Sequence, residues 1–283
     1  MKRGKPLKLA TQNLVGAREQ ANDKCVHATK VEINGHTSKE ATEHGLCTLA
    51  ILGPFWDLLS RVIKMVYVNG IHIYVDVVGR GKPLVFVHGN GEDHTIFDTL
   101  VEKLKENFTC YVMDSRSHGK SEFSHDLHYD VMAQDVYGVI EHFKLDQPGF
   151  IGFSDGGIIG LHLAYTYPEL FSKVMVLGAN IHTKGIVKPV REAWLQIYQK
   201  TQDPLFRLMI EEPNYRFKDL EKIKASVMVV VGEHDVISKR HTKAIVRHIH
   251  DAKLVVMKEK HHEDYIVHRD DVYPLCMNFF TKP

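Results

Sequence analysis

Short apolar runs alternate along this chain with longer stretches in which apolar residues recur every three or four positions. The apolar runs lie at 84–87, 109–113, 149–151, 174–177, 227–231 and 254–257. Nearly continuous apolar runs of this length are typical of strands that are buried on both faces of a sheet. The stretches with helical spacing lie at 96–104, 131–143, 158–167, 239–249 and the C-terminus. This alternation predicts an α/β domain with a mostly parallel sheet flanked by helices.

The start of the chain has a different character. Residues 1–45 are rich in polar side chains and show no sustained strand or helix period, so we expect residues 1–64 to form a loosely ordered N-terminal extension. Whether this extension is native, added or the result of a misassigned start stays open. Met65 precedes a segment, 66–75, that predicts two strands turning at Asn69-Gly70. We therefore expect the folded domain to span residues 65–283.

Composition and charge indicate which classes of molecule this protein is expected to bind. The 283 residues carry 36 Lys and Arg against 35 Asp and Glu, a net charge of +1, which does not favour nucleic acid or an anionic membrane surface. The longest apolar stretch, 46–59, is interrupted by Gly53, Pro54 and Asp57 and is too short to span a bilayer. No apolar segment near the start resembles a signal peptide. We expect a cytoplasmic protein that binds a small molecule and neither nucleic acid nor membrane.

Neither the cysteines nor the histidines form a metal-binding pattern. The four cysteines are widely separated with no C-x-x-C spacing, which disfavours a disulfide framework and a structural zinc site. The nineteen histidines include no H-x-x-x-H or H-E-x-x-H cluster beside acids on one predicted helix. The sequence therefore predicts no metal and no cofactor.

A candidate nucleophile lies in the pentapeptide Gly152-Phe153-Ser154-Asp155-Gly156. It fits G-x-S-x-G and stands between a predicted strand and a predicted helix, which is the context that a nucleophile elbow requires. Small residues on either side leave room for a tight turn that strains the serine backbone. The turn would project the Ser154 hydroxyl into a cleft at the N-terminus of the helix.

Two further candidates follow later strands of the same sheet. Asp235 ends the segment Gly232-Glu233-His234-Asp235, which follows the run at 227–231, and His261-His262 follow the run at 254–257. The carboxyl ends of parallel strands meet at one edge of a sheet, where α/β proteins place their sites. An acid there can orient an imidazole, and the imidazole can accept the proton of a serine.

Four motifs together resemble the α/β-hydrolase superfamily, over about residues 66–283. They are Val87-His-Gly-Asn-Gly91, Asp114-Ser-Arg-Ser-His-Gly-Lys-Ser121, Gly152-Phe-Ser-Asp-Gly-Gly157 and Gly232-Glu-His-Asp235. The chain order Ser, Asp, His is also that of this superfamily. The chain departs from the family pattern at Ser117 and His118, where the family has its first glycine region, and at Lys260, where the family has glycine before its histidine.

The resemblance implies roles for particular residues. The backbone N–H groups of Asn90 and Asp155 would form the oxyanion hole. His262 is expected to be the base, because similar family members carry an aromatic residue three positions after the catalytic histidine, here Tyr265. His261 would be its solvent-facing neighbour, although the residue types alone leave the choice between the two histidines open.

The family also inserts a lid between two sheet strands, which corresponds here to about residues 180–222. The aromatic content of this segment predicts a short helical lid over an apolar acyl or aryl pocket. The resemblance thus implies a serine hydrolase that cleaves a small-molecule ester or related acyl bond through an acyl-enzyme. Alternatives on the same fold are a thioesterase, a peptidase, a C–C hydrolase, a perhydrolase and a small-molecule receptor. The sequence leaves the oligomeric state open.

Overall fold

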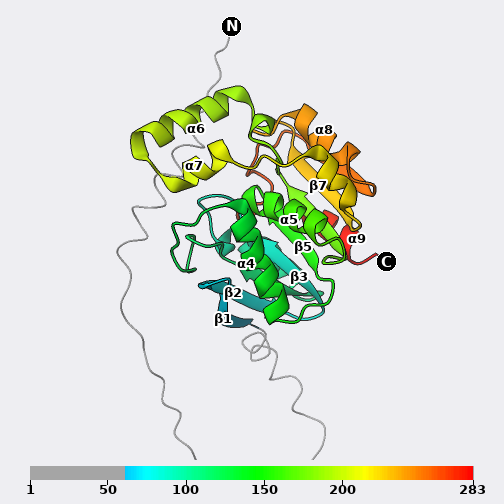
Figure 1. The fold of residues 1–283 in the computed structure, drawn as a ribbon. Coiled ribbons are helices and arrows are strands. Elements are labelled where there is room, and N and C mark those ends of the chain that lie inside the picture. The colour runs from blue at the N-terminus through cyan, green and yellow to red at the C-terminus, as the bar shows by residue number, and fades with distance from the viewer. Residues whose placement is uncertain (1–60, 283) are drawn as a thin grey trace, which may run out of the picture. The chain divides into compact units, whose positions relative to one another are not determined.

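A computed structural model describes residues 61–282 (Figure 1). Eight strands form one sheet in the spatial order β1-β2-β4-β3-β5-β6-β7-β8. They are β1 (Arg61–Val68), β2 (Ile71–Gly79), β3 (Lys82–Val87), β4 (Phe108–Met113), β5 (Gly149–Phe153), β6 (Lys173–Leu177), β7 (Ser226–Gly232) and β8 (Ala252–Met257). β1 and β2 are antiparallel to their neighbours, and the strands from β4 to β8 run parallel. The mostly parallel sheet predicted from the apolar runs is confirmed.

Helices occupy the connections between the parallel strands, and one more, α9, follows the last strand. They are η1 (His94–Phe97), α3 (Asp98–Leu104), α4 (Tyr129–His142), α5 (Asp155–Thr166), η2 (Thr183–Gly185), α6 (Lys188–Thr201), α7 (Pro204–Glu211), η3 (Phe217–Lys222), α8 (Lys239–Arg247) and α9 (Tyr273–Phe280). In Figure 1, α4 and α5 lie side by side over one face of the sheet. None of the helices within residues 61–282 is long and apolar enough to cross a bilayer.

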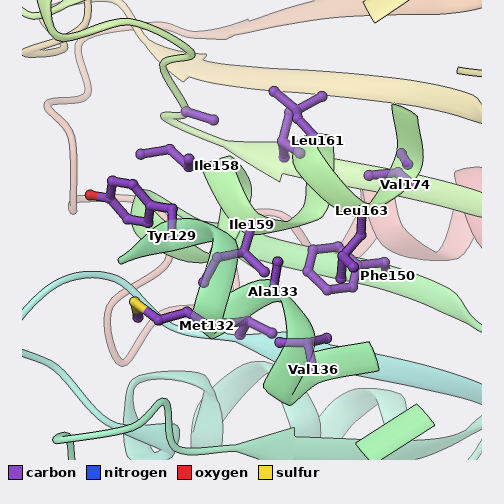
Figure 2. Close-up of a cluster of buried hydrophobic side chains, with 14 of the residues drawn as sticks. Tyr129, Met132, Ala133, Val136, Phe150, Ile158, Ile159, Leu161, Leu163 and Val174 are labelled. Carbon is purple, nitrogen blue, oxygen red and sulfur yellow. The ribbon is translucent and has the colours of Figure 1, made fainter. Parts of the chain in front are cut away.

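The strands bury side chains on both faces because successive residues of a strand point in opposite directions. In β3, Val85 and Val87 join the cluster beneath α4 and α5, whereas Leu84 and Phe86 join a second cluster beneath α3 and α9. Figure 2 shows the first cluster, in which Phe150 of β5 faces side chains of α4 and α5. This burial on two faces explains why the strands are nearly continuous apolar runs.

The first two strands form the expected hairpin. Asn69 and Gly70 both have positive φ, at 48° and 78°, which is the geometry of a two-residue turn between antiparallel strands. β1 begins at Arg61, so Met65 lies within the strand and not at its start. The rest of the expected N-terminal extension, residues 1–60, lies outside the described residues.

Candidate active site

The nucleophile candidate Ser154 occupies a sharp turn between β5 and α5. Its φ of 49° and ψ of −110° are a strained combination for a residue with a side chain. A Cβ on Gly152 would lie 2.3 Å from the carbonyl oxygen of Gly156, and a Cβ on Gly156 would lie 2.0 Å from the carbonyl oxygen of Val87. Glycine is therefore required on both sides of the turn, as the G-x-S-x-G pattern predicted.

Two backbone hydrogen bonds hold this turn against the neighbouring strands. The N–H of Ser154 donates to the carbonyl of Leu177 at 2.8 Å, and the N–H of Gly156 donates to the carbonyl of His88 at 3.0 Å. Both acceptors lie at the carboxyl ends of β6 and β3, which flank β5 in the sheet. The strained serine is thus held in place by the sheet itself.

The structure brings His262 and Asp235 to the serine. His262 Nε2 lies 3.1 Å from Ser154 Oγ, and its Nδ1 lies 2.8 Å from Asp235 Oδ1. The Asp235 carboxylate also accepts the N–H of Ile237 at 2.9 Å and that of Gly232 at 3.2 Å. Its side chain is 1% exposed. The backbone donors fix the carboxylate, and the carboxylate orients the imidazole.

Charge coupling between Asp235 and His262 sets the protonation of this pair. Burial opposes ionisation of Asp235, but the adjacent His262 and the backbone N–H groups of Ile237 and Gly232 outweigh it, so the pKa of Asp235 is lowered. Burial likewise disfavours the charged form of His262, but the charge and hydrogen bond of Asp235 outweigh it and raise the pKa of His262. The pair therefore favours a carboxylate beside an imidazole that accepts a proton readily.

The neighbouring histidine points elsewhere. His261 Nδ1 lies 2.9 Å from Asp264 Oδ2, and the His261 side chain is 58% exposed. Of the two adjacent candidates, His262 is the one that contacts both Ser154 and Asp235.

A residue that the sequence reasoning missed packs against the imidazole. Gly178 directly follows β6 and has a φ of 61°. A Cβ at this position would lie 2.6 Å from Cε1 of His262 and 2.8 Å from its Nδ1. Its signal in the sequence was a glycine immediately after a buried strand, at the edge where sites are built.

The N–H groups of the loop after β3 differ in whether they have an acceptor. The N–H of Gly89 donates to the Glu92 carboxyl at 3.0 Å, and the N–H of Gly91 donates to His118 Nε2 at 3.0 Å. Within residues 61–282, neither the N–H of Asn90 nor that of Asp155, at the start of α5, has an acceptor. These are the two N–H groups that the family pattern assigns to the oxyanion hole.

The comparison with known proteins agrees with this architecture. A family model described as alpha/beta hydrolase fold matches residues 82–208. The chain has the α/β-hydrolase fold. It is 24% identical over 247 residues to the serine hydrolase BPHL of Mus musculus, covering 76% of this chain and 84% of that protein. It is 27% identical over 227 residues to the uncharacterized hydrolase YugF of Bacillus subtilis, covering 78% and 77%.

A solved structure shows the same fold. The esterase EaEST from Exiguobacterium antarcticum superposes with a TM-score of 0.68 at 21% identity, covering 77% of this chain and 98% of that one. At this identity the superposition establishes the shared fold.

One departure from the α/β-hydrolase pattern has a structural account. Ser117 stands where the family has glycine and adopts a φ of 62°, the left-handed backbone region that glycine occupies most easily. Its neighbour His118 is buried, and His118 Nδ1 donates to the carbonyl of Arg116 at 2.9 Å. This leaves Nε2 as the acceptor for Gly91, so the segment supports the loop that carries Asn90.

Glu92 is a second group that the sequence reasoning missed. Desolvation of its partly buried carboxyl, together with nearby Glu263, raises the pKa of Glu92 to about 8. At neutral pH the carboxyl is therefore mostly uncharged while it accepts the N–H of Gly89. An uncharged Glu92 adds no negative charge beside the proposed oxyanion site.

The expected lid segment, 180–222, contains η2, α6, α7 and η3. A pocket beside Ser154 and His262 is lined in part by Trp194 of α6 and Met209 of α7. Ile186 and Ile237 also line it, together with polar groups from Tyr129, Asp155, Asn180 and Glu212. The lid helices thus form part of the pocket wall.

One group within the described residues brings possible metal ligands together, namely Asp93, His94 and Asp114. His94 Nδ1 and its backbone N–H both contact Asp114 Oδ1, at 2.8 Å and 2.6 Å. Asp93 Oδ1 accepts the N–H of Thr95 at 2.8 Å and caps η1. Hydrogen bonding within the chain accounts for this cluster.

Proposed function

We propose that this chain is a serine hydrolase that cleaves a small-molecule ester through an acyl-enzyme on Ser154. The observation that carries the proposal is the contact of His262 with both Ser154 Oγ, at 3.1 Å, and Asp235 Oδ1, at 2.8 Å, beside a strained elbow. Enzymes that transfer acyl groups through a serine nucleophile use this arrangement, in which a histidine contacts the serine and an acid orients the histidine. The hydrolase names of the curated relatives point to the same class of reaction.

In the first half of the proposed reaction, neutral His262 takes the proton of Ser154 as Oγ attacks the carbonyl carbon. The negative charge that forms on the carbonyl oxygen is stabilised by the N–H groups of Asn90 and Asp155. Asp235 holds the His262 tautomer and stabilises the imidazolium. His262 then donates its proton to the leaving alcohol, and the acyl group remains on Ser154.

In the second half, a water molecule gives a proton to His262 and attacks the acyl carbon. A second tetrahedral intermediate collapses, His262 returns the proton to Ser154 Oγ, and the carboxylic acid leaves. The apolar side chains of Ile186, Trp194, Met209 and Ile237 form one part of the pocket wall, and this part would accommodate an apolar acyl group. We therefore propose a small ester with an apolar acyl group as the substrate.

A fluorophosphonate probe tests the nucleophile directly, because it forms a covalent bond with an activated serine. We expect labelling of the wild-type chain at Ser154, identified by peptide mapping, and no labelling of Ser154→Ala at an unchanged circular dichroism spectrum. Labelling that persists in Ser154→Ala would contradict the assignment.

A panel of p-nitrophenyl esters of increasing chain length then tests the substrate class. We expect sustained turnover without any added protein. Labelling of Ser154 without turnover of any ester, thioester or amide would favour the receptor alternative, and preference for a thioester or amide would change the substrate class but not the triad.

A further inference from the structure

The two residues whose backbone N–H groups form the proposed oxyanion hole also bond to each other through their side chains. Asn90 Nδ2 donates to Asp155 Oδ2 at 3.0 Å. Asn90 lies in the loop after β3, whereas Asp155 begins α5. The bond therefore joins two segments that are far apart in the sequence, at the point where their N–H groups must act on one atom.

The Asp155 carboxylate is itself held from the opposite side. Its Oδ1 accepts the hydroxyl of Tyr129 at 2.8 Å, and Tyr129 is the first residue of α4. Tyr129 is 1% exposed and Asp155 is 3% exposed. Figure 2 shows the Tyr129 ring within the cluster of side chains under α4 and α5. The rigid core thus fixes the carboxylate. The carboxylate holds Asn90 together with the carbonyl of Leu205, which accepts Asn90 Nδ2 at 3.4 Å.

Burying a carboxylate without a cation is costly, so its retention here calls for a physical reason. Burial raises the pKa of Asp155 to about 6, while the Tyr129 and Asn90 donors act in the opposite direction. The group is thus mostly ionised at neutral pH and accepts both hydrogen bonds as a charged acceptor, which strengthens them. An acid whose only role was to interact favourably with the dipole of the α5 N-terminus would not need the hydrogen bonds from Tyr129 and Asn90.

We propose that the Asn90–Asp155 side-chain hydrogen bond, anchored by Tyr129, sets the separation of the two N–H groups that stabilise the oxyanion. The side chains of Asp155 and Tyr129 are then positioning groups, and the backbone N–H of Asp155 is in addition one of the two donors. This inference rests on the proposed function. Displacement of one donor by about 1 Å weakens transition-state stabilisation more than substrate binding, so the loss falls on kcat.

A double-mutant cycle of Asn90→Ala, Asp155→Ala and the double variant tests this inference. Each variant keeps its backbone N–H, so a loss reports donor position and not donor removal. With p-nitrophenyl acetate we expect each single variant to lose roughly 10- to 100-fold in kcat with little change in KM. The double variant should be no slower than the slower single variant, because one shared interaction is already lost.

Asn69→Gly is the matched control, because glycine keeps the positive φ of 48° that the turn requires. Asn69 Nδ2 donates to the buried Asp135 at 2.9 Å, so this variant removes the same kind of bond at the β1–β2 turn. We expect its kcat to be unchanged. If Asp155→Ala does not fold, the cycle is run with Tyr129→Phe and Asn90→Ala, where the same non-additive loss in kcat is expected.

The outcomes separate this inference from the proposed function. If the losses in kcat of the two single variants multiply in the double variant, the positioning role is overturned. It is also overturned if the loss in Asp155→Ala falls on KM and depends on the charge of the substrate, because that result indicates direct contact between Asp155 and the substrate. Unchanged kcat in Asn90→Ala would also overturn it. Absence of fluorophosphonate labelling at Ser154 in the wild-type chain would overturn both proposals.

Discussion

The elbow region, β5 with Ser154 and α5, differs sharply from the lid, residues 180–222. Every residue of β5 and nine residues of α5 are buried, whereas helix α6 of the lid buries none of its residues. The atoms proposed to react are thus held by packing on all sides. Trp194, which lines the pocket, lies on α6, a helix with little packing around it, so substitutions there and at the elbow should have different consequences.

The largest expected effect comes from the imidazole in the rigid region. His262→Ala should lower kcat by about 10⁴- to 10⁶-fold, because it removes the proposed base and acid of both half-reactions. His261→Ala removes an exposed side chain paired with Asp264 and should change kcat less than twofold or so. Both are compared with wild type by ester turnover at matched circular dichroism. Near-normal turnover of His262→Ala would reject its assignment as base.

A smaller loss is expected from Gly178→Ala. The added Cβ would lie within 2.6 Å of the His262 ring, and the residue has a φ of 61° that alanine adopts reluctantly. Displacement of the imidazole should lower kcat about 100-fold. Fluorophosphonate labelling should slow in proportion while thermal unfolding stays cooperative. Wild-type kcat in a folded Gly178→Ala would show that the ring tolerates this displacement.

The pH dependence of kcat/KM gives a graded test of the same region. His262 acts as a base only when neutral, and its pKa is raised, so kcat/KM should fall as pH drops through a midpoint above its ordinary value of about 6.5. The fall approaches tenfold per pH unit below the midpoint. His261→Ala should leave the midpoint unchanged. A flat profile from pH 5 to 8 would contradict a histidine base.

The smallest effect on rate is expected in the lid. Trp194 lines the pocket, whereas its neighbour Leu195 is 42% exposed. Trp194→Ala should shift the preferred acyl chain to longer esters by roughly tenfold in relative kcat/KM, with a loss in stability of less than about 1 kcal/mol. Leu195→Ala serves as control and should change neither quantity. Unfolding of Trp194→Ala would show that the lid is packed more firmly than α6 suggests.

The sequence allowed the fold to be predicted wherever one residue pattern decided an element. The apolar runs marked the parallel strands because these are buried on both faces, and Asn69-Gly70 marked the hairpin because both residues need positive φ. The first residue of β1 was harder to predict from the sequence. Its residues outside Val66 are exposed or only partly buried, so no apolar period separates Arg61 from what precedes it.

The candidate site was predictable where chemistry followed a strand end, as at Ser154 and Asp235. Residues whose role depends on distant contacts gave no such signal. Tyr129 begins an ordinary helix, and only the packing of α4 on α5 brings its hydroxyl to Asp155. Glu92 was likewise invisible, because its raised pKa arises from burial and from Glu263, far along the chain.

The strained backbone conformation of Ser154 lowers the thermal stability of this chain. A side chain at φ 49°, ψ −110° costs about 1–3 kcal/mol, which glycine would not incur because it has no Cβ. Ser154→Gly should therefore unfold at a higher temperature than Ser154→Ala, which keeps the Cβ and the strain, while both are inactive. Selection for thermal stability alone would replace this serine with glycine, so catalytic activity and thermal stability place opposite demands on residue 154.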